Sequence, residues 1–465
     1  MSAIVQDSSA AIHGREQYTF FTGGMAALAG LMFGLDIGVI SGALDLIGKA
    51  FHASDQAKEW IVSSMMFGAA VGALAAGMLS FRLGRKLSLI LGAILFVVGS
   101  LFCAFSWDIQ SLIVARVVLG VAIGIATFTA PLYISEIAPP EKRGSMISTY
   151  QLMITIGILA AFVSDTLFSY SGAWRWMLGI VAVPGILFLI GVTRLPNSPR
   201  WLMMRGQKRE AREVLTALRA NKAAVDKEVG EIEEQLRRPQ IGWSLFRQNS
   251  NFRRSVFLGI ILQVVQQFTG MNVVMYYAPR IFEVAGFQGH AQLWGTAIVG
   301  LVNVLATFIA IGLVDRLGRR PVLLTGFTVM AIGMGVLGFL LHIGTHDLAM
   351  RLFAVAMLLI FITGFAMSAG PLIWVLCSEV QPTKGRDFGI AASTFTNWVA
   401  NFIVGITFLS MLNGLGNGPT FGIYAALNVV FILFTFFFVP ETKGITLEGI
   451  EANLMAGKPL RHIGT

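Results

Sequence analysis

The sequence predicts an all-α membrane protein with twelve transmembrane helices in two pseudo-symmetric six-helix bundles, joined by short cytoplasmic linker helices. Its composition, its long charge-free stretches and an internal repeat lead to this prediction. Of the 465 residues, 55% are hydrophobic and 13% are charged, and a soluble domain carries about twice that share of charge. A soluble protein of this size could not cover its surface with so few charges. The composition therefore excludes an ordinary soluble enzyme and a disordered chain.

The charge-free stretches are long enough to cross a membrane. A bilayer core requires about 20 apolar residues per helix, and helices satisfy their own backbone polar groups there. Six such stretches precede the middle of the chain, three of them with a single charge (Asp36, Arg116 or Asp165): 17–44, 60–81, 87–107, 109–135, 145–174 and 176–193. Six more follow it: 255–279, 284–314, 321–342, 352–378 and the two parts of 388–439, which a turn-like segment divides at 413–419.

Charged residues concentrate between the two groups of spans. The segment 200–238 is rich in Glu, Lys, Arg, Ala and Leu, and 210–218 has helical spacing of its apolar residues. We interpret it as a helical tether rather than a binding site, because charge runs are usually solvated faces. We therefore expect a cytoplasmic N-tail at 1–17, a bundle at 18–194, a linker at 195–250, a second bundle at 251–439 and a cytoplasmic C-tail at 440–465.

The distribution of basic residues predicts the orientation in the membrane. Most of the 34 Lys and Arg residues fall on the side that carries both tails and the linker. The positive-inside rule makes that side cytoplasmic, with both termini inside. The net charge of +9 thus reflects topology, and no nucleic-acid partner is expected. The two cysteines lie in apolar runs, which excludes a disulfide framework.

The two halves of the chain repeat each other. Arg82-Leu-Gly-Arg-Lys86 matches Arg316-Leu-Gly-Arg-Arg320, and Ser135-Glu-Ile-Ala-Pro139 matches Ser378-Glu-Val-Gln-Pro382. Each motif follows the second or the fourth span of its half. Parallel repeats of this kind are common in transporters, where the site lies between the repeats near the midplane.

Glu136 and Glu379 occupy matched positions at the cytoplasmic ends of their spans. Pairing with a nearby arginine would clamp each bundle when the inside is closed, and charge-assisted hydrogen bonds are strong enough for this role. The alternative is plain positive-inside anchoring of the loops. The candidate arginines are Arg85, Arg143, Arg319 and Arg386.

At these motifs the chain resembles the sugar-porter family of the major facilitator superfamily. Segments of the galactose/proton symporter type include Phe33-Gly-Leu-Asp-Ile-Gly-Val-Ile40 and Ala369-Gly-Pro-Leu-Ile-Trp374, and the arabinose/proton symporter type is next in similarity. The arabinose type shares the Asn of Pro196-Asn-Ser-Pro199, where the family usually has an acid. The family motifs are Arg82-Leu-Gly-Arg-Lys86, Pro131-Leu-Tyr-Ile-Ser-Glu136, Gln266-Gln-Phe-Thr-Gly-Met-Asn272, Asp315-Arg-Leu-Gly-Arg-Arg320 and Pro440-Glu-Thr-Lys-Gly444.

Asp36 lies near the middle of the first span, where a carboxylate costs about 2.5–3.5 kcal/mol on insertion scales. Desolvation favours its neutral form and a nearby cation favours the charged one. Arg116, the sole charge of the fourth span, is the natural partner. The pair is interpreted as a proton switch, with a static buried pair as the alternative. The resemblance implies the same, since symporters of the family carry an acid here and facilitators generally do not.

Amide side chains interrupt otherwise apolar spans and suit the hydroxyl groups of an uncharged sugar, because amides both donate and accept. Gly270 would permit the helix to unwind between them. Each amide alone could equally bond another helix, and each Trp could be core or interfacial packing. The residues themselves suggest Asn401 as a further amide and Trp398 as a further stacking surface. The resemblance implies sugar contacts at Gln151, Gln266, Gln267, Asn272, Asn303, Trp374 and Asn397, and an outward gate region at Tyr276 and Tyr277.

We expect proton-coupled import of a monosaccharide, with D-galactose or D-glucose favoured, across a bacterial inner membrane. An arabinose/xylose-proton symporter, an uncoupled sugar facilitator, a sugar receptor and a membrane enzyme are alternatives. The enzyme is disfavoured because amides are poor acid–base groups. Expected partners are the sugar, protons and the lipid bilayer, with a monomeric protein and no cofactor or metal.

Overall fold

The computed structural model describes residues 2–139, 143–219, 221–237 and 242–464, and their side chains except those of 2–20, 143, 144, 235, 311 and 313–315. The regular secondary structure of this part of the chain is all helical, without a strand. It contains twelve helices or helix pairs long and apolar enough to cross a membrane. The predicted all-α class and the twelve spans are confirmed.

The first bundle consists of α1 to α7, and its sixth span is divided at Val181, which separates α6 from α7. Its helices are α1 (Ser2–Phe51), α2 (Asp55–Arg82), α3 (Arg85–Ala104), α4 (Ile109–Ile137), α5 (Arg143–Ser169), α6 (Trp174–Ile180) and α7 (Ala182–Thr193). Helix α1 begins at Ser2 and continues without a break into its apolar part, Phe21–Phe51, and the cytoplasmic N-tail at 1–17 stays a prediction.

The second bundle consists of α12 to α19, and two of its spans are broken. Its helices are α12 (Ser250–Phe268), α13 (Met271–Val284), α14 (His290–Leu317), α15 (Arg319–Ile343), α16 (Leu348–Ala366), α17 (Ala369–Glu379), α18 (Arg386–Leu415) and α19 (Asn417–Phe438), with a 3₁₀ turn at Thr383–Gly385. Short helices α8 (Pro199–Met204), α9 (Lys208–Leu218), α10 (Lys222–Leu236) and α11 (Gly242–Gln248) lie between the bundles. The C-terminal segment holds α20 (Leu447–Met455) and a 3₁₀ turn at Leu460–His462.

The repeated loop motif has the same structural role in both bundles. Gly84 has φ +89° between α2 and α3, and Gly318 has φ +92° between α14 and α15. This backbone region favours glycine, so each glycine turns the chain directly from one span into the next. In the second bundle the carboxylate of Glu441 also accepts the backbone N–H groups of Arg319 and Arg320, at 3.1 and 3.0 Å.

Helices of one bundle approach to backbone contact where glycines face a neighbour. A Cβ atom on Gly120 of α4 would lie 2.0 Å from the carbonyl oxygen of Met65, and one on Gly68 of α2 would lie 2.2 Å from that of Val117. Such distances are far inside van der Waals contact, so only glycine fits at these positions. Small residues are the usual means of close helix packing in membranes.

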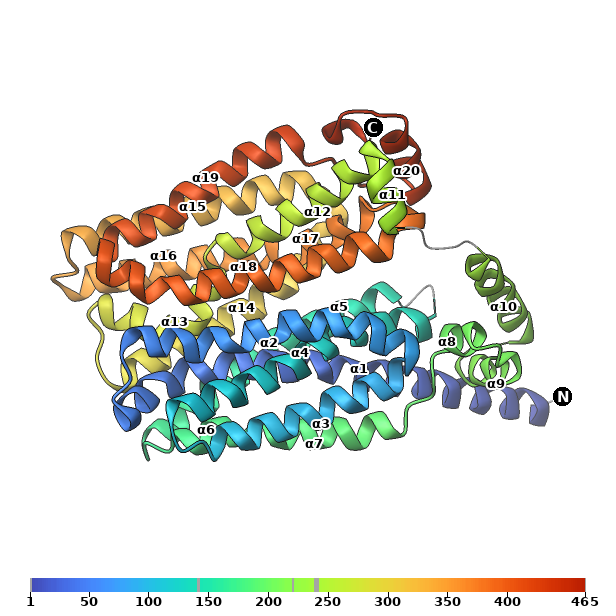
Figure 1. Cartoon of the computed structure of the whole chain (residues 1–465), viewed down its shortest axis with the longest axis horizontal. Coiled ribbons are helices and arrows are strands. Elements are labelled where there is room, and N and C mark those ends of the chain that lie inside the picture. Colours follow the sequence, from blue (N-terminus) through green and yellow to red (C-terminus); the bar gives the residue numbers. More distant parts are fainter. Residues whose placement is uncertain (1, 140–142, 220, 238–241, 465) are drawn as a thin grey trace.

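The two bundles lie side by side (Figure 1), with the linker helices and both chain ends at one end of the molecule. We call this the linker end and the opposite one the far end. In the described part of the chain, hydrogen bonds join the bundles in the far half, between α2 and α18 and between α5 and α14. Tyr170 stacks on His290 there with ring centroids 4.0 Å apart. The bundles are thus closed against each other at the far end.

Candidate functional site

A network of amide side chains lies where the broken helices of the second bundle meet. Nε2 of Gln266 donates to the carbonyl oxygens of Ala369 and Gly370, both at 3.0 Å, at the start of α17. Nδ2 of Asn397 on α18 donates to Oε1 of Gln263 at 2.6 Å and to Oε1 of Gln266 at 2.9 Å. The network joins α12, α17 and α18 and fixes the orientation of each amide.

The helix break at Gly270 positions the remaining polar pair. Gly270 has φ +92° and separates α12 from α13, which is the local unwinding that the sequence predicts. Across this break Nδ2 of Asn272 donates to Oε1 of Gln267 at 2.5 Å. Asn272 is half-buried, and Gln267 is 6% exposed. Their unused donor and acceptor groups can therefore serve a neutral, hydroxyl-rich ligand.

Two predicted amides stand apart from this network. Gln151 on α5 is half-buried and Asn303 on α14 is 4% exposed. Within the described side chains, neither amide has a hydrogen-bond partner. The two groups remain available for a ligand, but no contact links them to the Gln266 network.

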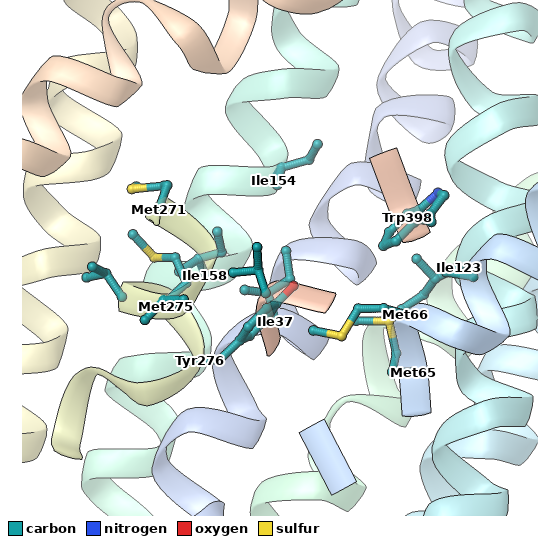
Figure 2. Packing of buried hydrophobic residues seen from close by; sticks show 14 of the residues in the cluster. Ile37, Met65, Met66, Ile123, Ile154, Ile158, Met271, Met275, Tyr276 and Trp398 are labelled. Carbon is teal, nitrogen blue, oxygen red and sulfur yellow. The ribbon is translucent and has the colours of Figure 1, made fainter. Parts of the chain in front are cut away.

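The two tryptophans differ in what they can contact. Trp374 on α17 is 39% exposed, so part of its side chain is accessible. Trp398 on α18 is 3% exposed and makes an edge contact with Phe33 of the first bundle, with centroids 5.4 Å apart. Figure 2 shows Trp398 beside Ile123 and Met66, among other apolar residues at the centre of the molecule. Trp398 therefore packs the two bundles together in this conformation.

Asp36 and Arg116 form a buried ion pair inside the first bundle. Nη1 of Arg116 lies 2.6 Å from Oδ1 of Asp36, and both side chains are at most 1% exposed. Nε of Arg116 donates to the carbonyl oxygen of Ile61 at 3.2 Å, so the guanidinium joins α1, α4 and α2. Asp36 Oδ2 and Arg116 Nη2 have no hydrogen-bond partner within the described residues. The pair is thus incompletely satisfied.

The two predicted gate tyrosines attach α13 to α18. The hydroxyl of Tyr276 accepts from Nδ2 of Asn401 at 3.1 Å, and that of Tyr277 donates to the carbonyl oxygen of Gly405 at 2.8 Å. Both rings are at most 1% exposed. Figure 2 shows Tyr276 near Ile37 and Met275 in the apolar centre.

Two ion pairs occupy equivalent places at the linker end. Arg85 bonds Glu136 at 2.7 Å and Arg319 bonds Glu379 at 3.1 Å. Each pair joins helices of the same bundle, and both are formed while the bundles are hydrogen-bonded to each other at the far end. The predicted pairing of each glutamate with an arginine is thus present, and its role as a clamp for a closed inside stays a prediction.

Of the other two candidate arginines, Arg386 has a described side chain, and its hydrogen bond goes elsewhere. Nε of Arg386 donates to the backbone oxygen of Gln381 at 3.3 Å instead, which satisfies the end of α17. The side chain of Arg143 lies outside the described residues. Of the four candidate arginines, Arg85 pairs with Glu136 and Arg319 pairs with Glu379.

Two functional candidates escaped the sequence analysis. Gln263 is one helical turn before Gln266 on the same face of α12, a spacing that could have indicated it. Glu59 is 1% exposed and bonds Ser410 of the other bundle. Its place at the edge of a span made it look like a charge at the membrane surface. No cluster of three His, Cys, Asp or Glu side chains suited to a metal is present in the described residues.

Comparison with known proteins decides the family. The model of the family "Sugar (and other) transporter" matches residues 23–454. The chain belongs to this sugar transporter family. This sugar transporter is 65% identical over 447 residues to a galactose-proton symporter of Escherichia coli (strain K12), covering 96% of each chain. It is 56% identical over 443 residues to an arabinose-proton symporter of the same strain, covering 94% of each chain.

Solved structures confirm the architecture of the sugar transporter. A partially occluded inward-open conformation of the xylose transporter XylE from E. coli is 31% identical, with a TM-score of 0.81 over 92% of this chain and 100% of that one. XylE bound to 6-bromo-6-deoxy-D-glucose, a proton:xylose symporter of the major facilitator superfamily, gives a TM-score of 0.79 over 94% and 99%. The fold is therefore that of the major facilitator superfamily, in a multi-pass membrane protein.

Proposed function

We propose that this sugar transporter imports a monosaccharide, D-galactose or D-glucose, together with protons across the bacterial inner membrane by alternating access. The buried ion pair of Asp36 and Arg116 carries the proton-coupling part of this proposal. A buried carboxyl whose charge depends on one movable cation responds to any change in that cation's position. The similarity to a galactose-proton symporter supports both the coupling and the sugar.

The sugar binds between the bundles, against the amide network of the second bundle. Its proposed contacts are Gln266, Gln267, Asn272 and Asn397 from that network, with Gln151 and Asn303 as free amides. Neutral amides suit an uncharged ligand with many hydroxyl groups, and the exposed face of Trp374 can stack on the apolar face of a pyranose ring.

The proton acts on the first bundle. Protonation of Asp36 weakens its attraction to Arg116 and favours sugar binding from outside. Opening toward the inside releases the sugar, and loss of the proton restores the ion pair and resets the carrier. Because the guanidinium also holds Ile61 of α2, its release loosens the contact between α1, α2 and α4.

We place the linker end in the cytoplasm, with both termini inside, from the distribution of basic residues. The far end then faces outward, and its inter-bundle hydrogen bonds close the outer side. The likeness to an inward-open XylE structure fits this assignment. The proposed organisation keeps bundles at 18–194 and 251–439, the linker at 195–250 and a C-tail at 440–465, in a monomer. Tyr276 and Tyr277 then belong to the outer gate.

Asp36→Asn tests the coupling. The protein is reconstituted into liposomes, a proton gradient is imposed, and labelled galactose uptake is followed. We expect the variant to exchange sugar across the membrane but not to accumulate it above equilibrium. If Asp36→Asn still accumulates sugar against a gradient, the coupling mechanism is wrong.

Two further measurements separate the alternative functions. An uncoupled facilitator would cause no alkalinisation of a weakly buffered medium when sugar is added, whereas a symporter consumes external protons. Competition of galactose uptake by glucose, arabinose and xylose distinguishes the favoured substrates from those of an arabinose/xylose-proton symporter. The 56% identity to an arabinose-proton symporter makes the second measurement necessary.

A further inference from the structure

A buried carboxylate crosses the seam between the bundles at the far end. Oε1 of Glu59 on α2 accepts the backbone N–H of Ser410 on α18 at 2.7 Å, and Oε2 accepts the hydroxyl of the same serine at 2.7 Å. Glu59 is 1% exposed. Both carboxylate oxygens are thus occupied by one residue of the opposite bundle.

Apart from the half-exposed contact of Asp55 with Asn413, the contacts of this seam described next are between apolar or small residues. Trp60 and Phe67 of α2 make ring contacts with Phe402 of α18, at centroid distances of 6.0 and 6.3 Å. Deeper in the seam, a Cβ atom on Gly405 would lie 2.9 Å from the hydroxyl oxygen of Ser63. Glu59 is therefore a buried charge within a close contact between two bodies that must separate during transport.

Burial of a carboxylate is costly unless it is well bonded. An apolar residue in its place would disfavour opening of the far end, because opening would expose its apolar surface to water. Glu59 instead gains two charge-assisted hydrogen bonds when the far end is closed and regains its hydration when the far end opens. Its bonds to Ser410 can exist in only one of the two states, so they bias that state selectively.

We propose that Glu59 is a gating residue of the transport cycle: its bidentate contact with Ser410 latches the far end closed and must break each time the carrier opens there. This inference rests on the proposed alternating-access function. The latch differs from the Asp36 switch because it joins the two bundles directly and lies outside the sugar and proton sites.

Spin labels at the far end measure the opening without sugar or a proton gradient. Trp107 of the first bundle and Leu348 of the second are 71% and 65% exposed, so cysteines at these positions accept labels. The native Cys103 and Cys377 are buried, and each is replaced by alanine in every protein compared. The distance distribution between the labels then reports the fraction of molecules open at the far end.

We expect Glu59→Ala to raise the ratio of open to closed molecules on the order of tenfold, because it removes both bonds. Glu59→Gln retains one acceptor and Ser410→Ala retains the backbone donor, so each should give a smaller shift in the same direction. The matched control is Asp55→Asn, one turn earlier on α2. Asp55 bonds Asn413 at 2.8 Å, and its side chain is 45% exposed. Exposed contacts contribute little, so this control should leave the distribution unchanged.

Unchanged distances in Glu59→Ala and in both milder variants would overturn the latch. A failure of the proposed function gives a different result, because liposomes with the native protein would then show no sugar uptake while the distances could still respond to Glu59. If Glu59→Ala does not fold, Glu59→Gln and Ser410→Ala decide the question alone.

Discussion

Nη1 of Arg116 lies 2.6 Å from Oδ1 of Asp36, and the same guanidinium donates through Nε to the carbonyl oxygen of Ile61. A single side chain thus connects a titratable acid on α1 to the backbone of α2. α2 in turn forms the closed seam with α18. This arrangement gives a direct physical route from the charge on Asp36 to the contact between the bundles.

Removal of one member of this pair should destabilise the protein strongly. Arg116→Gln leaves the Asp36 carboxyl buried without a cation, and breaking such a pair costs about 3–5 kcal/mol. Unfolding in detergent, followed by denaturant titration, measures the loss. The double variant Asp36→Asn with Arg116→Gln should recover much of the stability, because no unpaired charge remains. A double variant no more stable than Arg116→Gln would show that the pair is not the source of the loss.

Glu136 should stabilise the linker end of the first bundle. Its carboxylate accepts from Arg85 at 2.7 Å and from the hydroxyl of Ser198, which precedes α8, at 2.5 Å. Glu136→Gln removes the charge that strengthens both bonds, so we expect a loss of about 2 kcal/mol and easier protease cleavage near residues 205–207.

The second bundle provides the comparison. Glu379 accepts from Arg319 at 3.1 Å and from the hydroxyl of Thr442 at 2.5 Å. Glu379→Gln should cost a similar amount and expose the C-terminal segment instead of the linker. Equal cleavage of the linker in both variants would contradict separate roles in the two bundles.

The spans and the Asp36–Arg116 pair were predictable because each rests on a local signal. The length of an apolar stretch predicts a membrane helix. Asp36 and Arg116 are opposite charges in spans of one bundle, and an unpaired charge there is costly to bury, which predicts that they pair. The repeated motif predicted two equivalent halves, and the structure has equivalent turns in them at Gly84 and Gly318. These features need no knowledge of the packing between distant helices.

The Glu59–Ser410 contact could not be predicted in this way. The two residues are 351 positions apart, and a glutamate at the edge of a span is ordinarily solvated. Polar composition indicates where the membrane-spanning part of α1 begins, but it does not predict that the helix itself begins at Ser2. Arg386 was one of four candidate partners for the two glutamates, and in the structure it donates to the backbone oxygen of Gln381 instead.

Gln263 should orient the sugar site without itself contacting the sugar. It is fully buried, and its Oε1 accepts from Asn397 at 2.6 Å. Gln263→Ala frees the Asn397 side chain to turn away. We therefore expect KM for galactose to rise on the order of tenfold, which corresponds to the free energy of about one buried hydrogen bond. The maximal exchange rate should change little. Gln263→Glu keeps the acceptor and should restore a lower KM if positioning is the role.

A control for Gln263 lies at the far end. Gln292 on α14 donates to the carbonyl oxygen of Phe287 at 2.9 Å, remote from the network. Gln292→Ala should leave KM unchanged. A loss of maximal rate in Gln263→Ala without a change in KM would assign the residue to helix movement rather than to sugar orientation.

Gly120 should be irreplaceable by even the smallest side chain. A Cβ atom there would lie 2.0 Å from the carbonyl oxygen of Met65, and α2 and α4 could relieve the clash only by moving apart. Overpacking of this kind typically costs about 1–3 kcal/mol. Gly120→Ala should therefore lower the unfolding temperature in detergent, and it should reduce transport because α2 carries the Ile61 and Glu59 contacts.

Gly77→Ala is the matched control, since Gly77 lies on α2 and a Cβ atom there meets nothing within 4 Å. Alanine is the better helix former by about 1 kcal/mol, so Gly77→Ala should leave stability unchanged or raise it slightly. If both substitutions lowered the unfolding temperature equally, the effect would come from glycine flexibility in membrane helices. If only Gly120→Ala lowers the unfolding temperature, the cause lies in the contact between α2 and α4. Any displacement of these helices also alters the position of Ile61 relative to Arg116.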